Sequence, residues 1–188
     1  RRAARGAKAI VHFATKKIPK YGGTLDTLRV NRAGIETVLE TASRMRPRPR
    51  VLFASTSDVY GQNPHLPFSE ESRLVIGRTD IRRWAYAISK IFGESLGFAY
   101  REAHRVPFVA LRLFGMYGPR EILDWRGGPQ SVFIDAALRG EPLIVHGDGR
   151  QTRSFTFVDD AVDGVIRARE SPRAEGQVFN IGHDREIA

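Results

Sequence analysis

The stretch "VLFASTSDVYG", Val51–Gly61, changes character in its middle. Its first half is apolar and typical of a buried strand, whereas its second half brings three hydroxyls and a carboxylate together before a glycine. One interpretation is local, because Ser, Thr and Asp often cap helices or form turns. The other is a ligand site, because open parallel sheets bind ligands at the carboxyl ends of their strands. Both interpretations stay open from this stretch alone.

Strands and helices are expected to alternate on both sides of this stretch. Strands separated by helices of this length indicate a parallel sheet covered on both faces, so the predicted fold class is α/β. Residues 154–170 are expected to change from strand to helix, with Asp159 or Asp160 near the N-cap. The other expected strands cover 8–15, 50–55, 108–114, 143–146 and 177–182, and the other expected helices cover 24–45, 83–104 and 130–139.

Composition describes a globular protein with one domain-sized core. The chain has 188 residues, of which 41% are hydrophobic and 27% charged. No apolar run approaches the roughly 20 residues of a membrane helix, so no membrane partner is expected. The absence of cysteine excludes disulfides and thiolate metal sites and fits a cytoplasmic location. The five histidines stand far apart, and no metal site is predicted.

The net charge of +9 is confined to the first quarter of the chain. Residues 1–50 hold 13 basic and three acidic residues, whereas the remainder holds 17 basic and 18 acidic ones. Part of the excess is "RMRPRPR", Arg44–Arg50, whose prolines cannot continue a helix. We interpret this run as a solvated connector between helix and strand. A phosphate-binding patch is the alternative, but no nucleic-acid motif supports it, and no nucleic-acid partner is expected.

Tyr86 and Lys90, in "YAISK", lie four residues apart on one expected helix and so share a face. A phenol titrates near pKa ~10. A neighbouring ammonium favours the phenolate and makes tyrosine a usable base near neutral pH. The pair alone is weak evidence, because this spacing is common in amphipathic helices. Together with the hydroxyls of residues 55–57, it would clamp one substrate alcohol, as removal of a hydroxyl proton with hydride loss from the same carbon requires.

Six segments in order resemble the extended short-chain dehydrogenases/reductases, the NAD-dependent epimerases and dehydratases of nucleotide sugars. They are "VHFAT", "VNRAGIETVLE", "STSDVYG", "YAISK", "LRLFGMYGPR" and "VHGDGRQTRSFTFVDD". The resemblance implies a Rossmann-like doubly wound parallel sheet with part of a small C-terminal substrate-binding region. It assigns 1–114 to a partial NAD-binding domain that carries the Tyr/Lys helix. Residues 115–188 become a partial substrate-binding region interleaved with the last Rossmann strands.

The same resemblance implies roles for single residues. Tyr86 would be the base, Lys90 would bind the nicotinamide ribose and lower the pKa of that tyrosine, and Thr56 would hydrogen-bond the reacting hydroxyl. Ser57 and Asp58 complete the implied catalytic set. NAD contacts are implied for Ala14, Thr15, Asn31, Ser55, Tyr86, Lys90 and Phe114, and substrate contacts for Thr56, Arg120 and Arg153.

Arg153 would hold the substrate diphosphate, for which a guanidinium fork is well suited. A surface salt bridge is the alternative role for this arginine. The resemblance implies no metal ligands in this site. A homodimer is expected, because helix 84–100 is apolar on more than one face and this helix pairs with its counterpart in the family.

The chain departs from the family pattern in three places. It contains no G-x-x-G-x-x-G fingerprint, so the opening βαβ, a loss of about 60 residues, is expected to be missing. Gly115 stands where the family usually has a substrate-contacting asparagine. Asp58 follows Thr56 and Ser57, and it is either part of the chemistry or a turn former before Gly61.

Position 57 bears on the reaction type. The related 4,6-dehydratases resemble T-D-E here, and Ser57 lacks that acid. Decarboxylases of UDP-glucuronate resemble T-S-E, from which Asp58 differs by one methylene, whereas 4-epimerases carry small or neutral residues. We expect a UDP-sugar 4-epimerase that works through a 4-keto intermediate. A UDP-glucuronate decarboxylase is the first alternative, and an inactive fragment or binding module is the second.

Overall fold

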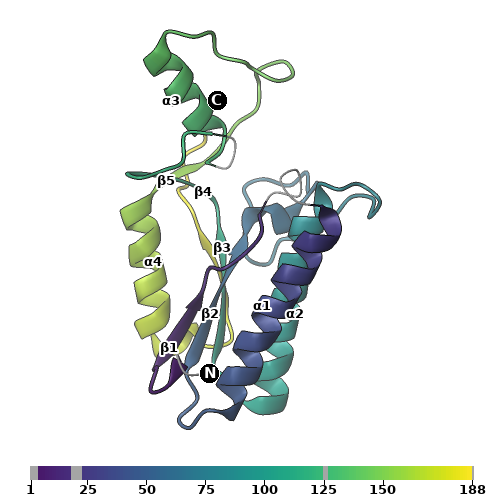
Figure 1. Ribbon diagram of the computed structural model, residues 1–188, viewed down its shortest axis with the longest axis vertical. Helices are drawn as coiled ribbons and strands as arrows, with labels where there is room; N and C mark the ends of the chain where they lie inside the picture. The colour runs from purple at the N-terminus through teal and green to yellow at the C-terminus, as the bar shows by residue number, and fades with distance from the viewer. Residues whose placement is uncertain (1–3, 18–22, 125–126, 188) are drawn as a thin grey trace. The chain divides into compact units, whose positions relative to one another are not determined.

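The computed structural model describes residues 4–17, 23–124 and 127–187, and it has the expected α/β fold (Figure 1). The chain divides into two compact units. The first consists of Arg1–Leu113 and Val165–Asn180, and the second of Phe114–Gly164 and Ile181–Ala188. Among the described residues, no helix is long and apolar enough to cross a membrane.

The first unit is built on a four-stranded sheet in the order β1-β2-β3-β6. β1 and β2 are parallel, with Ala9 beside Arg50, and β2 and β3 are parallel, with Val51 beside Phe108. The carboxyl ends of these strands therefore meet at one edge of the sheet. The strands are β1 (Ala9–His12), β2 (Arg50–Thr56), β3 (Phe108–Leu113) and β6 (Val178–Ile181).

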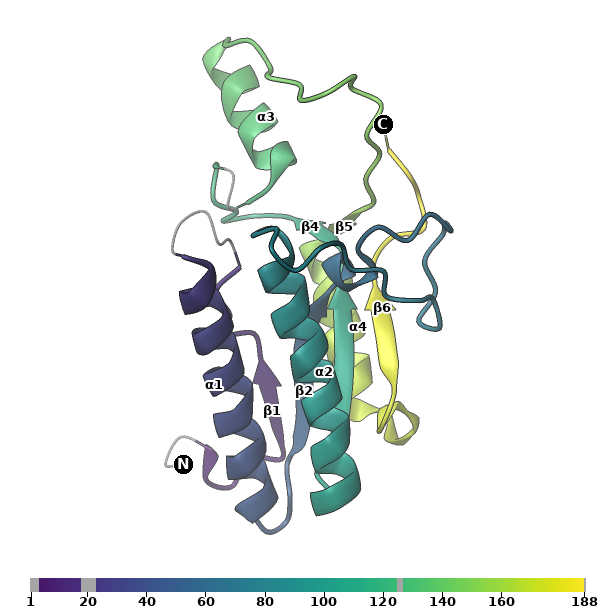
Figure 2. The ribbon, with the colours of Figure 1, turned by 90° about the vertical axis from the view of Figure 1, so that its right-hand side faces the viewer.

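Two long helices, α1 (Thr24–Arg44) and α2 (Trp84–His104), lie side by side on one face of this sheet (Figure 2). Both agree with the predicted ranges to within one residue. Helix α4 (Val158–Glu170) contributes its last residues, from Val165 on, to the first unit, and these lie on the opposite face (Figure 1).

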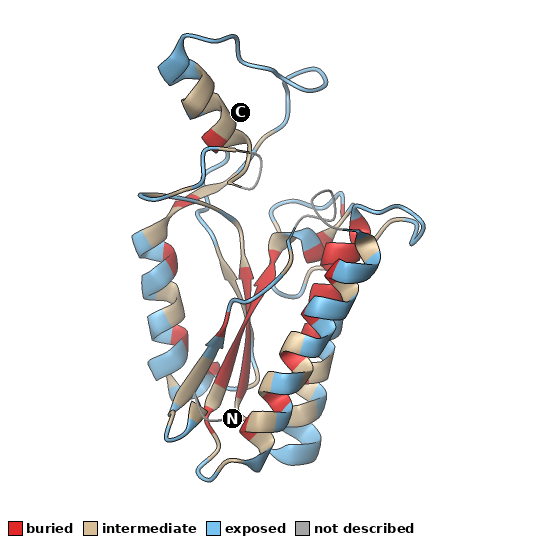
Figure 3. Cartoon of the chain, viewed as in Figure 1, coloured by how far each residue is buried: buried red, intermediate tan, exposed pale blue. Residues whose placement is uncertain are grey.

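The core of the first unit lies between the sheet and α1 and α2, where β2 and β3 are buried along most of their length (Figure 3). Two glycines on α2 allow the helix to approach the sheet closely. A Cβ on Gly93 would lie 2.4 Å from Cζ of Phe53, and one on Gly97 would lie 2.0 Å from Cζ of Phe108. The buried residues of the main cluster are Ile35, Leu39, Ala42, Val51, Phe53, Val106, Phe108 and Ala110.

Arg50, at the end of the basic run, has a structural role that the sequence did not reveal. Its guanidinium donates to the carbonyls of Ala168, Arg169 and Ser171, at 3.1, 2.7 and 2.8 Å. These carbonyls lie at the C-terminal end of α4, where a helix lacks partners and favours positive charge. The interpretation of the whole run as a solvated connector is therefore wrong for Arg50.

The second unit contains a two-stranded parallel sheet and the helix α3 (Pro129–Arg139). Its strands are β4 (Gly115–Tyr117) and β5 (Phe155–Phe157). The prediction of a strand over 143–146 is wrong, because this segment has no regular structure and Leu143, Ile144 and Val145 are at least half exposed. An apolar run forms a strand only where a neighbouring strand pairs with it. Strand β4 was missed because it lies in a Gly/Pro-rich segment.

Candidate active site

The hydroxyl-rich tip of β2 and the tyrosine of α2 meet in the first unit. Thr56 is the N-cap of a short 3₁₀ helix, η3 (Ser57–Tyr60), and its hydroxyl accepts a hydrogen bond from the backbone N–H of Asp58 at 3.2 Å. The Thr56 side chain also lies close enough to Tyr86 to act on its phenol. The two interpretations of this stretch are therefore compatible, since one threonine both caps a helix and contacts the tyrosine.

Lys90 is buried beside the same strand end, with only 2% of its surface exposed. Its ammonium donates to the carbonyl of Ala54 at 2.5 Å. It also lies over two aromatic rings, 4.8 Å from the ring centre of Phe53 and 5.6 Å from that of Tyr86. An ammonium carries three donors, so Lys90 has the capacity to bind further acceptors next to the tyrosine.

The acidity of Tyr86 differs from the expectation. Burial raises the pKa of this phenol well above its ordinary value, and the charge of Asp58 raises it further, while the neighbouring Thr56 side chain opposes both. The net pKa of Tyr86 is therefore raised in this structure, whereas the resemblance implied a lowered one. Burial also lowers the pKa of Lys90, to about 8, against the influence of Glu94. A lysine with this pKa is a weaker electrostatic partner at alkaline pH than an exposed one.

Asn31 ties together the three elements around Lys90. Its carbonyl oxygen accepts from the Thr15 hydroxyl at 3.1 Å and from the Lys16 backbone N–H at 2.7 Å. Its amide nitrogen donates to the Ser89 hydroxyl at 2.9 Å and to the Lys16 carbonyl at 3.2 Å. The Ser89 hydroxyl in turn donates to the carbonyl of Tyr86 at 2.7 Å. Asn31 thus joins the loop after β1 to the turn of α2 that carries the tyrosine.

The remaining implied residues of the first unit lie around this centre. Ala14 and Thr15 are exposed and follow β1 at the edge where Thr56 ends β2. Ser57 is half-buried and Asp58 exposed, both in the first turn of η3. The Asp58 carbonyl accepts from the backbone N–H of Gly61, as in a turn. Asp58 is therefore a turn residue whose charge also acts on Tyr86.

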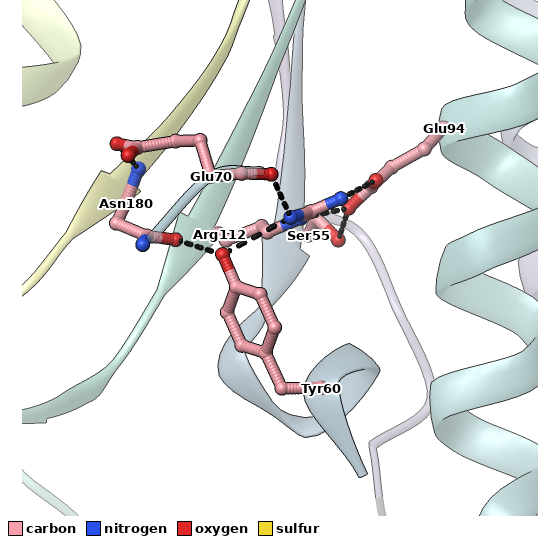
Figure 4. Close-up of polar contacts among 6 residues, drawn as sticks. All are labelled: Ser55, Tyr60, Glu70, Glu94, Arg112 and Asn180. Atoms are coloured by element: carbon pink, nitrogen blue, oxygen red, sulfur yellow. Dashed lines mark hydrogen bonds and ion pairs between the residues drawn. The ribbon is translucent and has the colours of Figure 1, made fainter. Parts of the chain in front are cut away.

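Ser55 faces a different set of partners. Its hydroxyl donates to the carboxylate of Glu94, which also forms a buried ion pair with Arg112, and these side chains converge in Figure 4. Sequence reasoning missed Glu94 and Arg112. A signal was present, because an arginine inside the apolar strand "FVALRLF" needs a buried acid as its partner. Which acid pairs with it depends on tertiary structure.

Phe114, Arg120 and Arg153 belong to the second unit. The backbone N–H of Phe114 donates to the Ile181 carbonyl at 2.9 Å. Arg120 lines an open hollow of about 480 Å³ together with Tyr117 and Phe157. Arg153 is exposed, its backbone pairs with that of Ile187, and its guanidinium donates to the Thr152 carbonyl. Within the described part of the chain, Arg153 has no ion-pair partner, so the alternative of a surface salt bridge finds no support.

No cluster of three or more His, Asp or Glu side chains that would hold a metal ion occurs in the described ranges.

The profile of the family described as "NAD dependent epimerase/dehydratase family" matches residues 2–182. The chain belongs to this family. Among curated members, it is 39% identical over 163 residues to a UDP-N-acetyl-alpha-D-glucosaminuronate decarboxylase of Bacillus cytotoxicus, covering 87% of this chain and 49% of that protein. It is 32% identical over 173 residues to a probable UDP-glucuronate 4-epimerase of Rhizobium meliloti, covering 89% and 47%.

Solved members of the epimerase/dehydratase family share the fold. A UDP-glucuronic acid 4-epimerase from Bacillus cereus, in complex with UDP-glucuronic acid and NAD, superposes with a TM-score of 0.85 at 27% identity. The match covers 99% of this chain and 57% of that one. The chain thus spans about half the length of the family members that it matches. The prediction of family and fold is confirmed.

Proposed function

We propose that this protein oxidises the C4 hydroxyl of a UDP-linked sugar with NAD and then returns the hydride to the opposite face, so that the sugar is epimerised at C4. The observation that carries the proposal is the meeting of Tyr86, Thr56 and Lys90 at the carboxyl end of β2. A phenol beside a hydroxyl and an ammonium is a donor set suited to hold one alcohol and move its proton.

The residues present fit NAD at this edge of the sheet. The ammonium of Lys90 spends one donor on Ala54 and has the capacity to bind the two hydroxyls of a ribose. Exposed Ala14 and Thr15 follow the neighbouring strand, and Asn31 fixes the loop that carries them. We assign NAD contacts to these residues, to Ser55 and, in the second unit, to Phe114. When bound, NAD supplies the hydride acceptor.

Tyr86 is the proposed base, and Thr56 orients the substrate hydroxyl toward it. In the forward step, the C4 hydroxyl gives its proton to Tyr86 and its carbon loses a hydride, which forms the 4-keto sugar. In the return step, the hydride comes back to C4 and Tyr86 gives the proton to the oxygen. Because burial raises the pKa of Tyr86, the phenolate needs nearby positive charge, which Lys90 supplies while it is protonated.

For the substrate, we propose a UDP-linked uronic acid. The names of the three family members described above all contain UDP and a sugar acid. Arg120 and Arg153 of the second unit are the proposed anion contacts, because guanidinium groups bind phosphate and carboxylate oxygens in pairs. The second unit is then the substrate-binding region.

Decarboxylation is the second candidate, and Asp58 favours it. In a 4-keto uronic acid, the C6 carboxylate lies β to the ketone, so carbon dioxide is readily lost. A carboxylate close enough to act on Tyr86 is present at Asp58, and the member from Bacillus cytotoxicus is named a decarboxylase. The two candidates share the oxidation step and differ in what happens to the keto sugar.

The test is to incubate the protein with NAD and UDP-glucuronate and to follow the sugar by NMR. Epimerisation gives the C4 epimer with its carboxylate retained. Carbon dioxide and a UDP-pentose would instead establish the decarboxylase. A protein that binds no NAD in a calorimetric titration, and converts neither UDP-glucuronate nor UDP-glucose, would contradict both candidates and support a binding module.

We also propose that the protein forms a homodimer through α2. Phe92 on this helix is 40% exposed, although the opposite face of the helix packs on the sheet. Sedimentation equilibrium checks this proposal directly, with Phe92→Glu expected to shift the dimer toward monomer.

A further inference from the structure

A buried ion pair lies behind the proposed site. The guanidinium of Arg112 on β3 donates twice to the carboxylate of Glu94 on α2, from Nε at 3.1 Å and from Nη2 at 2.8 Å. Both side chains are only 6% exposed. Replacing such a pair with apolar residues often leaves stability unchanged or improved, so stability alone does not explain its presence.

The pair reaches both flanks of the short segment Thr56–Val59. On one side, the hydroxyl of Ser55 donates to Glu94. On the other side, the hydroxyl of Tyr60 accepts from Arg112 Nη1 at 3.0 Å and donates to Asn180 at 2.6 Å (Figure 4). One ion pair therefore holds the residues immediately before and immediately after the segment that carries Thr56 and Asp58.

A second set of bonds extends this hold to β6 and the loop before α2. Arg112 Nη1 also donates to the carbonyl of Glu70 at 3.1 Å, and the Glu70 carboxylate accepts from the backbone N–H of Asn180 at 2.8 Å. Asn180 in turn donates from its amide to the carbonyl of Phe68 at 3.2 Å. The side chains of Arg112, Tyr60, Asn180 and Glu70 are therefore linked in a closed ring of hydrogen bonds, with the backbone of Asn180 and Glu70 completing it. This ring leaves Tyr60 little freedom to move.

We propose that Glu94 and Arg112 are positioning residues of the site, which hold Thr56 and Asp58 against Tyr86 by fastening both ends of the segment between Ser55 and Tyr60. The purpose given to this arrangement rests on the proposed function. Its test does not, because it measures hydrogen exchange and a lysine pKa rather than activity.

The pair has a second consequence, because Glu94 lies one helical turn from Lys90. Glu94 is the carboxylate that favours the charged form of Lys90 against burial. The other titratable groups near Lys90 are Tyr86 on α2 and His12 on β1. Burial and then the ammonium of Lys90 lower the pKa of His12, so this imidazole is neutral and adds no charge near pH 7. Removing Glu94 therefore leaves Lys90 without its supporting anion.

The test compares the wild type with the double variant Glu94→Gln, Arg112→Met, which removes both charges of the ion pair together and keeps an acceptor for Ser55. The control is Arg101→Gln, Glu175→Gln, because this pair also joins α2 to another segment but is exposed.

Hydrogen exchange is followed at the amides of Asp58 and Gly61, which donate to Thr56 and Asp58 of the segment, and at the amide of Val51 in β2. Lysine NMR reports the pKa of Lys90. Neither measurement needs NAD or a sugar.

For the double variant, we expect exchange at Asp58 and Gly61 to accelerate by roughly tenfold or more, while Val51 keeps its protection. We also expect the pKa of Lys90 to fall below its wild-type value of about 8. The control should change neither. Equal acceleration at all three amides would overturn the proposal.

Tyr60→Phe is a second variant that keeps both charges and removes only the outer hydrogen bonds. It should accelerate exchange at Gly61 without moving the pKa of Lys90, and wild-type exchange in this variant would also count against the proposal. If the wild type converted no UDP-sugar, the proposed function would be contradicted. The exchange and pKa measurements would still test the positioning role.

Discussion

Lys90 and Tyr86 are both buried, and burial shifts their pKa values in opposite directions, downward for Lys90 and upward for Tyr86. Each shift favours the neutral form of its group. For Lys90 the folded-state pKa is about 8, against 10.5 for an exposed lysine. For Tyr86 the folded-state pKa is raised above 10. Both shifts make the stability of the fold depend on alkaline pH.

The sign of this dependence follows from proton binding. Below pH 8, Lys90 is protonated in both states. Between pH 8 and 10, the unfolded chain holds a proton that the folded protein has lost, so the free energy of unfolding rises with pH. Above pH 10, Tyr86 ionises first in the unfolded chain, and this gain is lost again.

We therefore expect the wild type to gain stability relative to Lys90→Met between pH 8 and 10, by as much as about 3 kcal/mol. Urea unfolding of both proteins at several pH values measures this difference. The comparison with Lys90→Met removes the contribution of all other titrating groups. If the difference in the free energy of unfolding stayed constant from pH 7 to 10, the lowered pKa of buried Lys90 would be contradicted.

At the scale of single residues, the sequence predicted the centre of the site better than its surroundings. The spacing of Tyr86 and Lys90, and the hydroxyl at Thr56, follow from local pattern and family resemblance, and these side chains do come together. The bonds of Ser55 to Glu94 and of Glu94 to Arg112 join residues far apart in the chain. No periodicity in one segment indicates such a pairing. The raised pKa of Tyr86 was also not predictable, because it depends on burial.

At the scale of elements, the long helices were predicted closely because their apolar residues recur over many turns. The short elements were not, because three residues carry too little periodicity to identify β4. Close packing of α2 on the sheet was also invisible in the sequence, although it explains why glycines occur inside a helix. A helical glycine ordinarily costs about 1 kcal/mol relative to alanine, so its presence calls for a packing reason.

Gly97→Ala should destabilise the protein by roughly 1–3 kcal/mol, because the new Cβ would lie 2.0 Å from the ring of Phe108. Gly34→Ala in α1 is the matched control. Its Cβ would lie 3.4 Å from the nearest atom, in the ring of His12, so better helix propensity should offset any strain. Thermal unfolding of both variants checks this pair. A Gly97→Ala variant as stable as Gly34→Ala would show that α2 does not approach β3 this closely.

At the scale of the whole molecule, the chain contains α2, which carries Tyr86 and Lys90, and the strands that follow it, but it spans only about half the length of its relatives. Family and fold could be predicted because six motifs occur in order. The choice between epimerisation and decarboxylation could not, because the two proposed reactions share their first step and differ only in the fate of a keto sugar.

The central claim is that Tyr86 removes the proton from the sugar hydroxyl while NAD accepts the hydride. The most direct measurement is the rate at which reduced nicotinamide forms after the protein and NAD are mixed with UDP-glucuronate, compared between wild type and Tyr86→Phe. We predict that this rate falls at least about a hundredfold in Tyr86→Phe, while its affinity for NAD is unchanged. Reduction of NAD by Tyr86→Phe at the wild-type rate would contradict the account.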